Sequence, residues 1–277
     1  MSCPDCFRGG VATGTPSGTT KELHGFSTYI ASPPTQEATS TTAKSAPTII
    51  FFTDAFGHLL PNNFVLADAL AAKTGFTVLV PDIIPGGGMS PTVIPLMDTF
   101  SSPDAGALTK AWAFARAMVH VIPFFRRASP QSEKSTVPCV DYAHAVKKNL
   151  PVGAKLGIAG YCWGGYQALN IARQATESLT DVIFVAHPAK YEAAQAEEAV
   201  GKGVKLSFAH AGEDMSLPIS KIEETKKALD GSQAFDLKVY EECAHGFAVR
   251  ANPAKEREAK AAEEALEQAA KWFEKWL

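Results

Sequence analysis

The feature that most constrains the fold is a series of short, fully apolar segments separated by longer amphipathic ones. Thr48–Thr53 (TIIFFT) and Thr77–Pro81 (TVLVP) lack the polar alternation of a half-exposed strand. Strands of this kind are buried on both faces, as in a parallel sheet that helices cover. We therefore expect strands here and in four later segments: Leu156–Gly160, Val182–Ala186, Val204–Ala209 and Asp236–Tyr240.

The segments between these strands resemble helices in their apolar spacing and in their end residues. Pro61–Thr74, for example, begins with a proline and ends just before Gly75, which are good start and stop signals. Parallel strands require such crossovers. The order predicts one α/β domain, a mostly parallel sheet with helices on both faces. The other expected helices are Leu108–Arg127, Pro138–Asn149, Gly164–Thr176, Pro218–Leu229 and Ala254–Trp276.

Three further segments do not follow this alternation. Gly25–Ser32 alternates apolar and polar residues, which predicts an edge strand. Pro33–Pro47 is small and polar and reads as a loop, and Ile84–Phe100 is rich in proline and glycine, which suggests an irregular lid over the strand ends. We expect residues 1–24 to form an N-terminal arm and residues 25–277 to form the domain.

Composition narrows the class of partner. With 46% hydrophobic and 20% charged residues, the chain has ample material for a core and is not disordered throughout. The formal net charge is −3 and no basic stripe occurs, which argues against binding of nucleic acid. No apolar run is long enough to span a membrane, and the polar start lacks a secretory signal. We expect a cytosolic protein that does not bind membranes.

The cysteines fit neither a disulfide framework nor a metal site. There are five, an odd number, and a cytosolic location would keep them reduced. Cys3 and Cys6 form a C-x-x-C pair, but no second pair follows at the spacing that zinc requires. His58 and His144 have no neighbouring ligand either. We expect no metal.

The most informative stretch is Gly160–Gly164 (GYCWG), which follows a predicted buried strand and opens a helix. It matches the G-x-S-x-G nucleophile elbow, with sulfur in place of oxygen. Small residues two positions either side of the nucleophile let strand and helix close tightly around a strained turn. This turn would expose Cys162 near a helix N-terminus, with the amide of Trp163 directed at a developing oxyanion. The alternative is a buried structural cysteine beside a glycine-rich helix start.

An elbow nucleophile needs an acid and then a histidine after later strands. Asp214 follows the strand Val204–Ala209, and His245 follows the strand Asp236–Tyr240. Both would lie at the carboxyl edge of the sheet, where α/β proteins keep their sites. We therefore predict a catalytic triad of Cys162, His245 and Asp214, with Glu213 as the competing acid.

With these residues in place, the sequence resembles the dienelactone hydrolase family of the α/β-hydrolase superfamily. The resemblance covers about Gly25 to Leu277, and the N-terminal leader suggests the larger fungal branch of the family. It implies hydrolysis of enol lactones and related esters without a cofactor. The motifs that carry it are Thr53–Gly57 (TDAFG), Pro81-Asp82, Gly160–Gly165 (GYCWGG), Ala211–Asp214 (AGED) and Ala244–Phe247 (AHGF).

The resemblance also assigns roles around the nucleophile. Asp54 matches the acidic residue that bonds the resting thiol, although the family more often has glutamate there. The amide of Ala55 matches the second donor of the oxyanion hole. Arg250 lies near, but one residue away from, the position of an arginine that binds a substrate carboxylate.

Other residues have weaker assignments. Phe56, Tyr161 and Phe247 are candidate pocket walls, although core packing explains them equally well. His187 and His210 stand at strand ends, where a structural histidine is the simpler interpretation. Arg116, Arg126 and Arg127 are further candidates for a carboxylate, or surface arginines.

The sequence thus predicts a hydrolase that opens a lactone or cleaves a small ester through a thioester on Cys162. Acyl transfer or processing of a polyketide thioester on the same triad is the alternative reaction. A non-catalytic scaffold is the alternative class. The sequence leaves open whether the protein is a monomer or a homodimer.

Overall fold

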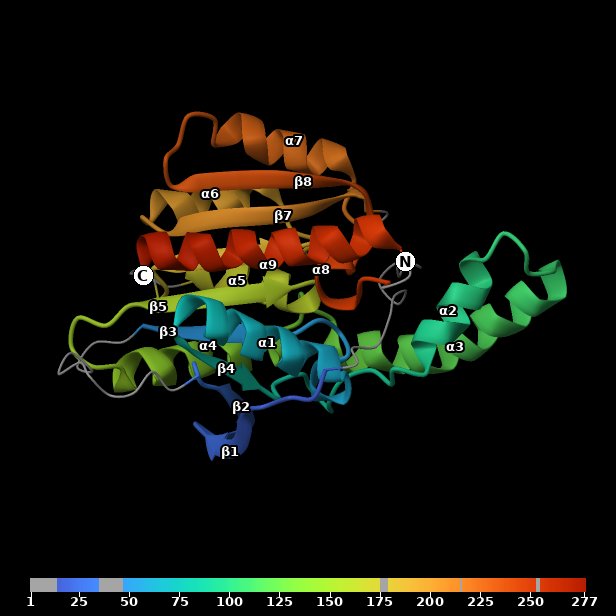
Figure 1. Ribbon diagram of the computed structural model, residues 1–277, viewed down its shortest axis with the longest axis horizontal. Coiled ribbons are helices and arrows are strands. Elements are labelled where there is room, and N and C mark those ends of the chain that lie inside the picture. Colours follow the sequence, from blue (N-terminus) through green and yellow to red (C-terminus); the bar gives the residue numbers. More distant parts are fainter. Residues whose placement is uncertain (1–13, 35–46, 175–178, 215, 253–254) are drawn as a thin grey trace.

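The computed structural model describes residues 14–34, 47–174, 179–214, 216–252 and 255–277. Within them a single sheet of eight strands runs in the order β1-β2-β4-β3-β5-β6-β7-β8 (Figure 1). Strands β1 and β2 join the sheet antiparallel, and all other pairs are parallel. The strands are β1 Thr19–Leu23, β2 Phe26–Ala31, β3 Thr48–Phe52, β4 Thr77–Pro81, β5 Leu156–Tyr161, β6 Val182–Ala186, β7 Lys205–Glu213 and β8 Phe235–Ala244.

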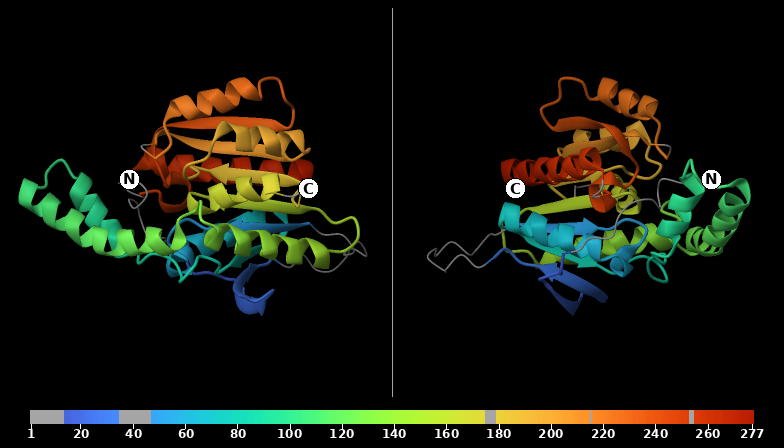
Figure 2. Two further views of the ribbon diagram at one scale, coloured as in Figure 1. Left: turned by 180° about the vertical axis from the view of Figure 1, so that it is seen from behind. Right: turned by 45° about the vertical axis from the view of Figure 1, so that its right-hand side comes forward.

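Helices cover both faces of the sheet, as expected for an α/β-hydrolase fold. On one face α1 packs beside α9, and on the other face α5 packs between α4 and α6 (Figures 1 and 2). The helices are α1 Pro61–Thr74, α2 Val93–Ser101, α3 Ala107–Ala128, α4 Glu133–Asn149, α5 Trp163–Gln174, α6 Ala193–Gly201, α7 Ile219–Ala228, α8 Phe247–Arg250 and α9 Glu256–Trp276, with a short 3-10 turn at Gly57–Leu59.

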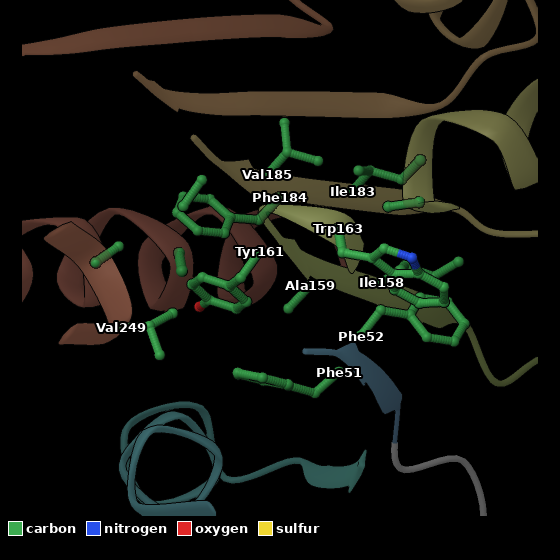
Figure 3. Packing of buried hydrophobic residues seen from close by; sticks show 14 of the residues in the cluster. Phe51, Phe52, Ile158, Ala159, Tyr161, Trp163, Ile183, Phe184, Val185 and Val249 are labelled. Carbon is green, nitrogen blue, oxygen red and sulfur yellow. The ribbon is translucent and has the colours of Figure 1, made fainter. Parts of the chain in front are cut away.

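The core lies between the central strands and these helices. Every residue of β5 and β6 is buried, which is why their sequences are apolar without alternation. Phe51 stacks on Tyr161 with ring centroids 4.6 Å apart, and Phe184 packs on the other side of that tyrosine (Figure 3). Removing one such ring would cost about 3–5 kcal/mol.

Two sequence predictions were wrong at the edges of elements. The strand near Gly25–Ser32 is not at the edge, because β1 pairs outside it, and β1 is polar enough to be mistaken for loop. Helix α4 begins at Glu133 rather than at Pro138. The proline lies inside the helix, where it removes one backbone hydrogen bond but does not end the helix. The expected loop 33–47 and the pair Cys3 and Cys6 fall mainly or wholly outside the described residues.

The expected irregular lid is partly helical. Its second half forms α2, which packs on α3 as a helical hairpin, here called the arm, that projects from the body (Figures 1 and 2). Arg127 fixes the base of the arm by donating hydrogen bonds to the carbonyls of Pro85, Gly87 and Gly88. None of the described helices, including the long helix α3, has the length and apolarity to cross a membrane.

Candidate active site

The turn that carries Cys162 is strained and tightly packed. Cys162 has a φ of 50°, in the left-handed region that few residues other than glycine adopt. A Cβ at Gly164 would lie 2.1 Å from the carbonyl oxygen of Phe52, and one at Gly160 would lie 2.6 Å from that of Gly164. Only glycine fits at either position, because the crowding atoms belong to the backbone. Helix α5 therefore starts directly against β3 and β5.

Neighbouring loops hold this turn in place. The amide of Gly164 donates to the carbonyl of Thr53, 3.0 Å away, which ties the turn to the loop after β3 that carries Asp54 and Ala55. The amide of Ala189 donates to the carbonyl of Cys162 at 2.9 Å, which ties the turn to the loop after β6. Cys162 itself is 4% exposed, so the turn presents its side chain in a nearly closed site.

Asp214 and His245 form a buried pair at the same edge of the sheet. His245 Nδ1 lies 2.8 Å from Asp214 Oδ2. Because an ionised carboxylate only accepts, Nδ1 carries the proton and donates it, which leaves Nε2 to exchange protons with a reacting group. The amides of Ser216 and Leu217 donate to the other carboxylate oxygen, Oδ1, at 2.8 and 3.0 Å. The competing acid, Glu213, is exposed.

The electrostatic balance keeps Asp214 ionised. Burial raises the pKa of this carboxyl, but the charge and the hydrogen bond of His245 outweigh it, with smaller help from His210 and the Leu217 amide, and the net pKa is lowered. Asp214 is therefore an acceptor that orients the imidazole of His245 and stabilises its protonated form.

Two further buried histidines surround this pair. His187 follows directly after β6. Its ring contacts that of His245 edge-on, with centroids 4.9 Å apart. Burial, followed by the charges of His245 and Arg250, lowers the pKa of His187 well below its ordinary value. Burial likewise lowers the pKa of His210 to about 4, although Asp214 partly opposes this. Both rings are neutral at pH 7. Since His187 and Ala189 belong to one loop, that loop contacts both His245 and the backbone of Cys162.

Asp54 and Arg250 form a second buried pair. Arg250 Nη1 donates to Asp54 Oδ2, and both side chains are almost completely buried. The other oxygen, Oδ1, accepts from the amide of Phe56 and from Asn63 Nδ2, each at 3.1 Å. The guanidinium lies over the ring of Phe56, 5.1 Å from its centroid. Asp54 and Arg250, to which the family resemblance assigns separate roles, thus bind each other.

Helix α8 begins in a way that makes room for this arginine. Gly246 has a φ of 92°, and a Cβ there would lie 2.1 Å from Arg250 Nη2. The positive φ favours glycine here, and any larger residue would also have to displace the guanidinium of Arg250. The turn at Gly246 therefore leaves space for the guanidinium of Arg250 next to His245.

A pocket of about 460 Å³ opens beside His245, Phe247 and Arg250, between α2 and the loops after β7 and β8. Its two cations are already paired, Arg250 with Asp54 and Lys255 with Glu258. Carboxylates outnumber cations around it, so its rim is acidic. The acidic residues are Asp98, Glu213, Glu242 and Glu258.

Comparisons with known proteins identify the family of this chain. The sequence profile described as "Dienelactone hydrolase family" matches residues 34–277. The chain belongs to the dienelactone hydrolase family. It is 24% identical to Hydrolase pyvD of Aspergillus violaceofuscus, over 98% of this chain and 96% of that one. It is also 24% identical to Dienlactone hydrolase 1 of Gibberella moniliformis, over 98% and 93%.

Solved structures show the same fold. A Klebsiella pneumoniae protein, provisionally named a dienelactone hydrolase, superposes with a TM-score of 0.61 at 15% identity, over 91% of this chain and 93% of that one. Native esterase 2 of Thermogutta terrifontis superposes with a TM-score of 0.55 at 14% identity, over 92% of each chain. The α/β-hydrolase architecture is therefore shown, and with the family profile it makes this chain a hydrolase of the dienelactone hydrolase family.

Of the three candidate wall residues, Phe56 and Tyr161 are buried and do not line the pocket. Tyr161 is buried between Phe51 and Phe184, and burial raises the pKa of its hydroxyl. Trp163 Nε1 donates to the carbonyl of Ala128, which joins the elbow to the base of the arm. Phe247 does line the pocket.

The remaining candidates have structural contacts. Arg127 braces the base of the arm, and Arg116 lies over the ring of Trp112 on the arm, 5.9 Å from its centroid. His58 Nε2 bonds the carbonyl of Val80. In the part of the chain that the structure describes, no group of three or more histidine, cysteine or acidic side chains could hold a metal ion.

Several residues around the site were not predicted from the sequence. Asn63, which bonds Asp54, lies on a helix that reads only as amphipathic. Asp98 reaches the pocket because α2 forms where proline and glycine suggested irregular chain. Helical spacing of the apolar residues from Val93 to Met97 is the signal that could have found it.

Proposed function

We propose that this protein hydrolyses lactones or small carboxylic esters with Cys162 as nucleophile, His245 as general base and Asp214 as the acid that orients it. The observation that carries the proposal is the strained cysteine turn, tied by one loop to a buried histidine–carboxylate pair. A strained elbow and a fixed His–Asp pair at the same sheet edge are what nucleophilic acyl chemistry needs.

The proposed reaction has two halves. His245 Nε2 takes the thiol proton while the sulfur of Cys162 attacks the ester carbonyl, and the C–O bond then breaks as His245 returns the proton to the leaving oxygen. The acyl group is left as a thioester on Cys162. Water, deprotonated by His245, attacks this thioester and releases the acid, and the thiol regains its proton. In a lactone, acid and alcohol remain in one molecule.

The amides of Trp163 and Ala55 are the proposed oxyanion donors. The first opens helix α5, where the helix dipole favours a negative charge. The second lies in the loop that the Gly164–Thr53 hydrogen bond holds against that helix start. The two amides would stabilise the tetrahedral oxyanion in both halves of the reaction.

We propose that Asp54 and Arg250 act as a unit. The resemblance gives Asp54 a bond to the resting thiol and Arg250 a bond to a substrate carboxylate, yet these groups neutralise each other in the structure. A carboxylated substrate would have to compete with Asp54 for the guanidinium. With the acidic rim of the pocket, this favours neutral or cationic esters and lactones over carboxylated ones.

The direct test compares wild type with Cys162→Ala and Cys162→Ser on p-nitrophenyl acetate and on a series of lactones of graded size. We expect Cys162→Ala to lose nearly all turnover, and iodoacetamide to label Cys162 and to abolish activity. Wild-type turnover by Cys162→Ala would overturn the proposal. Failure of the wild type both to be labelled and to turn over any ester would favour the scaffold.

Three expectations from the sequence accompany the proposal without a separate observation. They are a cytosolic location, catalysis without a cofactor, and a division into an N-terminal segment of residues 1–24 and a domain of residues 25–277. Strand β1 lies in the first of these segments and pairs with β2 of the second.

Product analysis with an added thiol or alcohol separates hydrolysis from acyl transfer.

A further inference from the structure

The outer face of α3 carries exposed apolar side chains that neither α2 nor the body covers. Leu108, Trp112, Val119 and Ile122 are 88%, 60%, 64% and 50% exposed, with the exposed Ala115 at their centre. These five residues are called the strip. Monomeric proteins rarely leave contiguous apolar patches of more than a few hundred Å² in water.

The strip has the spacing of a helix–helix seam. Its members stand at positions 108, 112, 115, 119 and 122, so that steps of four and three alternate. The opposite face of α3, with Ala113, Ala117, Val121 and Phe124, is buried. Helix α3 is therefore apolar on two opposite sides, which is typical of a helix with packing partners on both. Among the described residues, only one of these two sides is packed against other parts of the chain.

We propose that two copies of this chain pair through the strip as an antiparallel homodimer, with the two-fold axis at Ala115. The numbering then matches every large side chain to an apolar one. About an axis at residue 115, Leu108 lies level with Ile122 of the partner subunit, and Trp112 lies within one residue, about 1.5 Å along the helix, of the level of the partner's Val119. The small side chain at position 115 lets the helices approach where they cross, and the interface is self-complementary, as two-fold symmetry requires.

Charge supports the antiparallel direction. Helix α3 has four basic residues and no acidic one, so parallel pairing would set like charges side by side. The antiparallel register instead brings Arg126, at the base of each arm, opposite Asp104 of the partner subunit, in the loop before α3. Both residues are exposed. Opposed helix dipoles favour the same direction.

The shape of the molecule also supports antiparallel pairing of the two arms. The arm projects from the body (Figures 1 and 2), so antiparallel arms place the two bodies at opposite ends of the pair, whereas parallel arms bring them together at one end. The strip and its margins would bury on the order of 1,000 Å² in total, at the low end for specific complexes. We therefore expect a dissociation constant in the micromolar range, about 1–100 μM.

Sedimentation velocity across a concentration series tests the dimer. The wild type should shift from monomer to dimer within that range, and Trp112→Glu and Val119→Glu should raise the dissociation constant by at least about 100-fold. Val152→Glu, at a fully exposed apolar residue in the turn before β5, is the matched control and should dimerise like wild type. Circular dichroism checks that each variant is folded. A monomeric wild type, or a dimeric Trp112→Glu, would overturn the proposal.

Cysteine cross-linking tests the register while leaving the strip almost intact. Under diamide, Ala115→Cys should form a disulfide-linked dimer, since the two copies of residue 115 meet at the axis. Leu108→Cys should not, because its two copies would lie about 21 Å apart along the helices. Wild type, treated alike, controls for its native cysteines. Cross-linking of Leu108→Cys as readily as of Ala115→Cys would contradict the antiparallel register.

A charge exchange and a vesicle test complete the set. Asp104→Arg should weaken the dimer several-fold, and adding Arg126→Asp should restore it. No restoration would contradict the register. Binding of a monomeric wild type to vesicles of phosphatidylserine and phosphatidylcholine, lost in Trp112→Glu, would assign the strip to a lipid surface instead and overturn the dimer.

Discussion

Two buried carboxylates at the carboxyl edge of the sheet have cationic partners of opposite character. Asp214 binds an imidazole, whose second ring nitrogen can exchange a proton with a reacting group, whereas Asp54 binds a guanidinium, which only donates hydrogen bonds. The first pair can therefore move protons, and the second can only hold charge. Removing the Asp214 carboxylate should therefore affect a different property of the protein from removing the Asp54 carboxylate.

The largest expected effect is on turnover through the first pair. Asp214→Asn keeps the shape of the side chain but cannot hold the Nδ1 proton of His245 in the same way, so the imidazole adopts the wrong tautomer. We expect kcat on p-nitrophenyl acetate to fall by about 10⁴-fold with little loss of stability, because His245 can remain neutral. Wild-type kcat in a folded Asp214→Asn would show that this pair is not catalytic.

The second pair should mainly support the fold. Asp54→Ala leaves the guanidinium of Arg250 buried without a counter-charge, which costs about 3–5 kcal/mol of unfolding free energy. The double variant with Arg250→Met removes both charges and should recover much of this loss. Urea denaturation of the three variants measures both effects. Equal stability of Asp54→Ala and wild type would contradict the buried pair.

The pH dependence of stability follows from the histidines beside the first pair. The pKa of His210 is about 4 in the fold and near 6.5 in the unfolded chain, so between these values only the unfolded state takes up the proton. Stability should then fall as the pH drops from 6.5 towards 4, by up to about 1.4 kcal/mol per pH unit for each such histidine. His187, with its lowered pKa, adds in the same direction.

Denaturation curves at pH 7, 6 and 5 measure this slope. His210→Gln should flatten it, whereas His144→Gln, at an exposed site, should leave it unchanged. A slope that His210→Gln does not alter would mean that His210 is not buried in the neutral form.

The smallest effect concerns substrate charge at the pocket rim. Glu242→Gln removes one exposed carboxylate, and we expect kcat/KM for a carboxylated ester to rise a few-fold relative to its neutral analogue, since exposed charges contribute about 1 kcal/mol or less. High salt should diminish the difference. An unchanged ratio would show that the acidic rim does not affect the choice between charged and neutral substrates.

The sequence predicted local features well and distant pairings poorly. The turn at Cys162 is encoded by five consecutive residues, and the buried strands are encoded by their own apolar runs. The order of Asp214 and His245 follows from the chain order of such sheets. In contrast, Asp54 and Arg250 are 196 positions apart and carry no shared pattern, so neither residue indicated that the other would neutralise it.

The arm was missed for a different reason. Proline and glycine between residues 84 and 100 obscured the helical spacing of α2, which is stable because it packs on α3. One residue of α2, Asp98, lines the pocket, so the missed helix also concealed part of the acidic rim.

The most direct test of the central claim is to trap the acyl-enzyme. Wild type mixed with excess p-nitrophenyl acetate and quenched in acid within the first turnover should carry one acetyl group, and peptide mapping should place it on the sulfur of Cys162 as a thioester that hydroxylamine removes. Asp214→Asn should form this species far more slowly. Turnover with no acetyl group on Cys162, or with the group on another residue, would contradict the account.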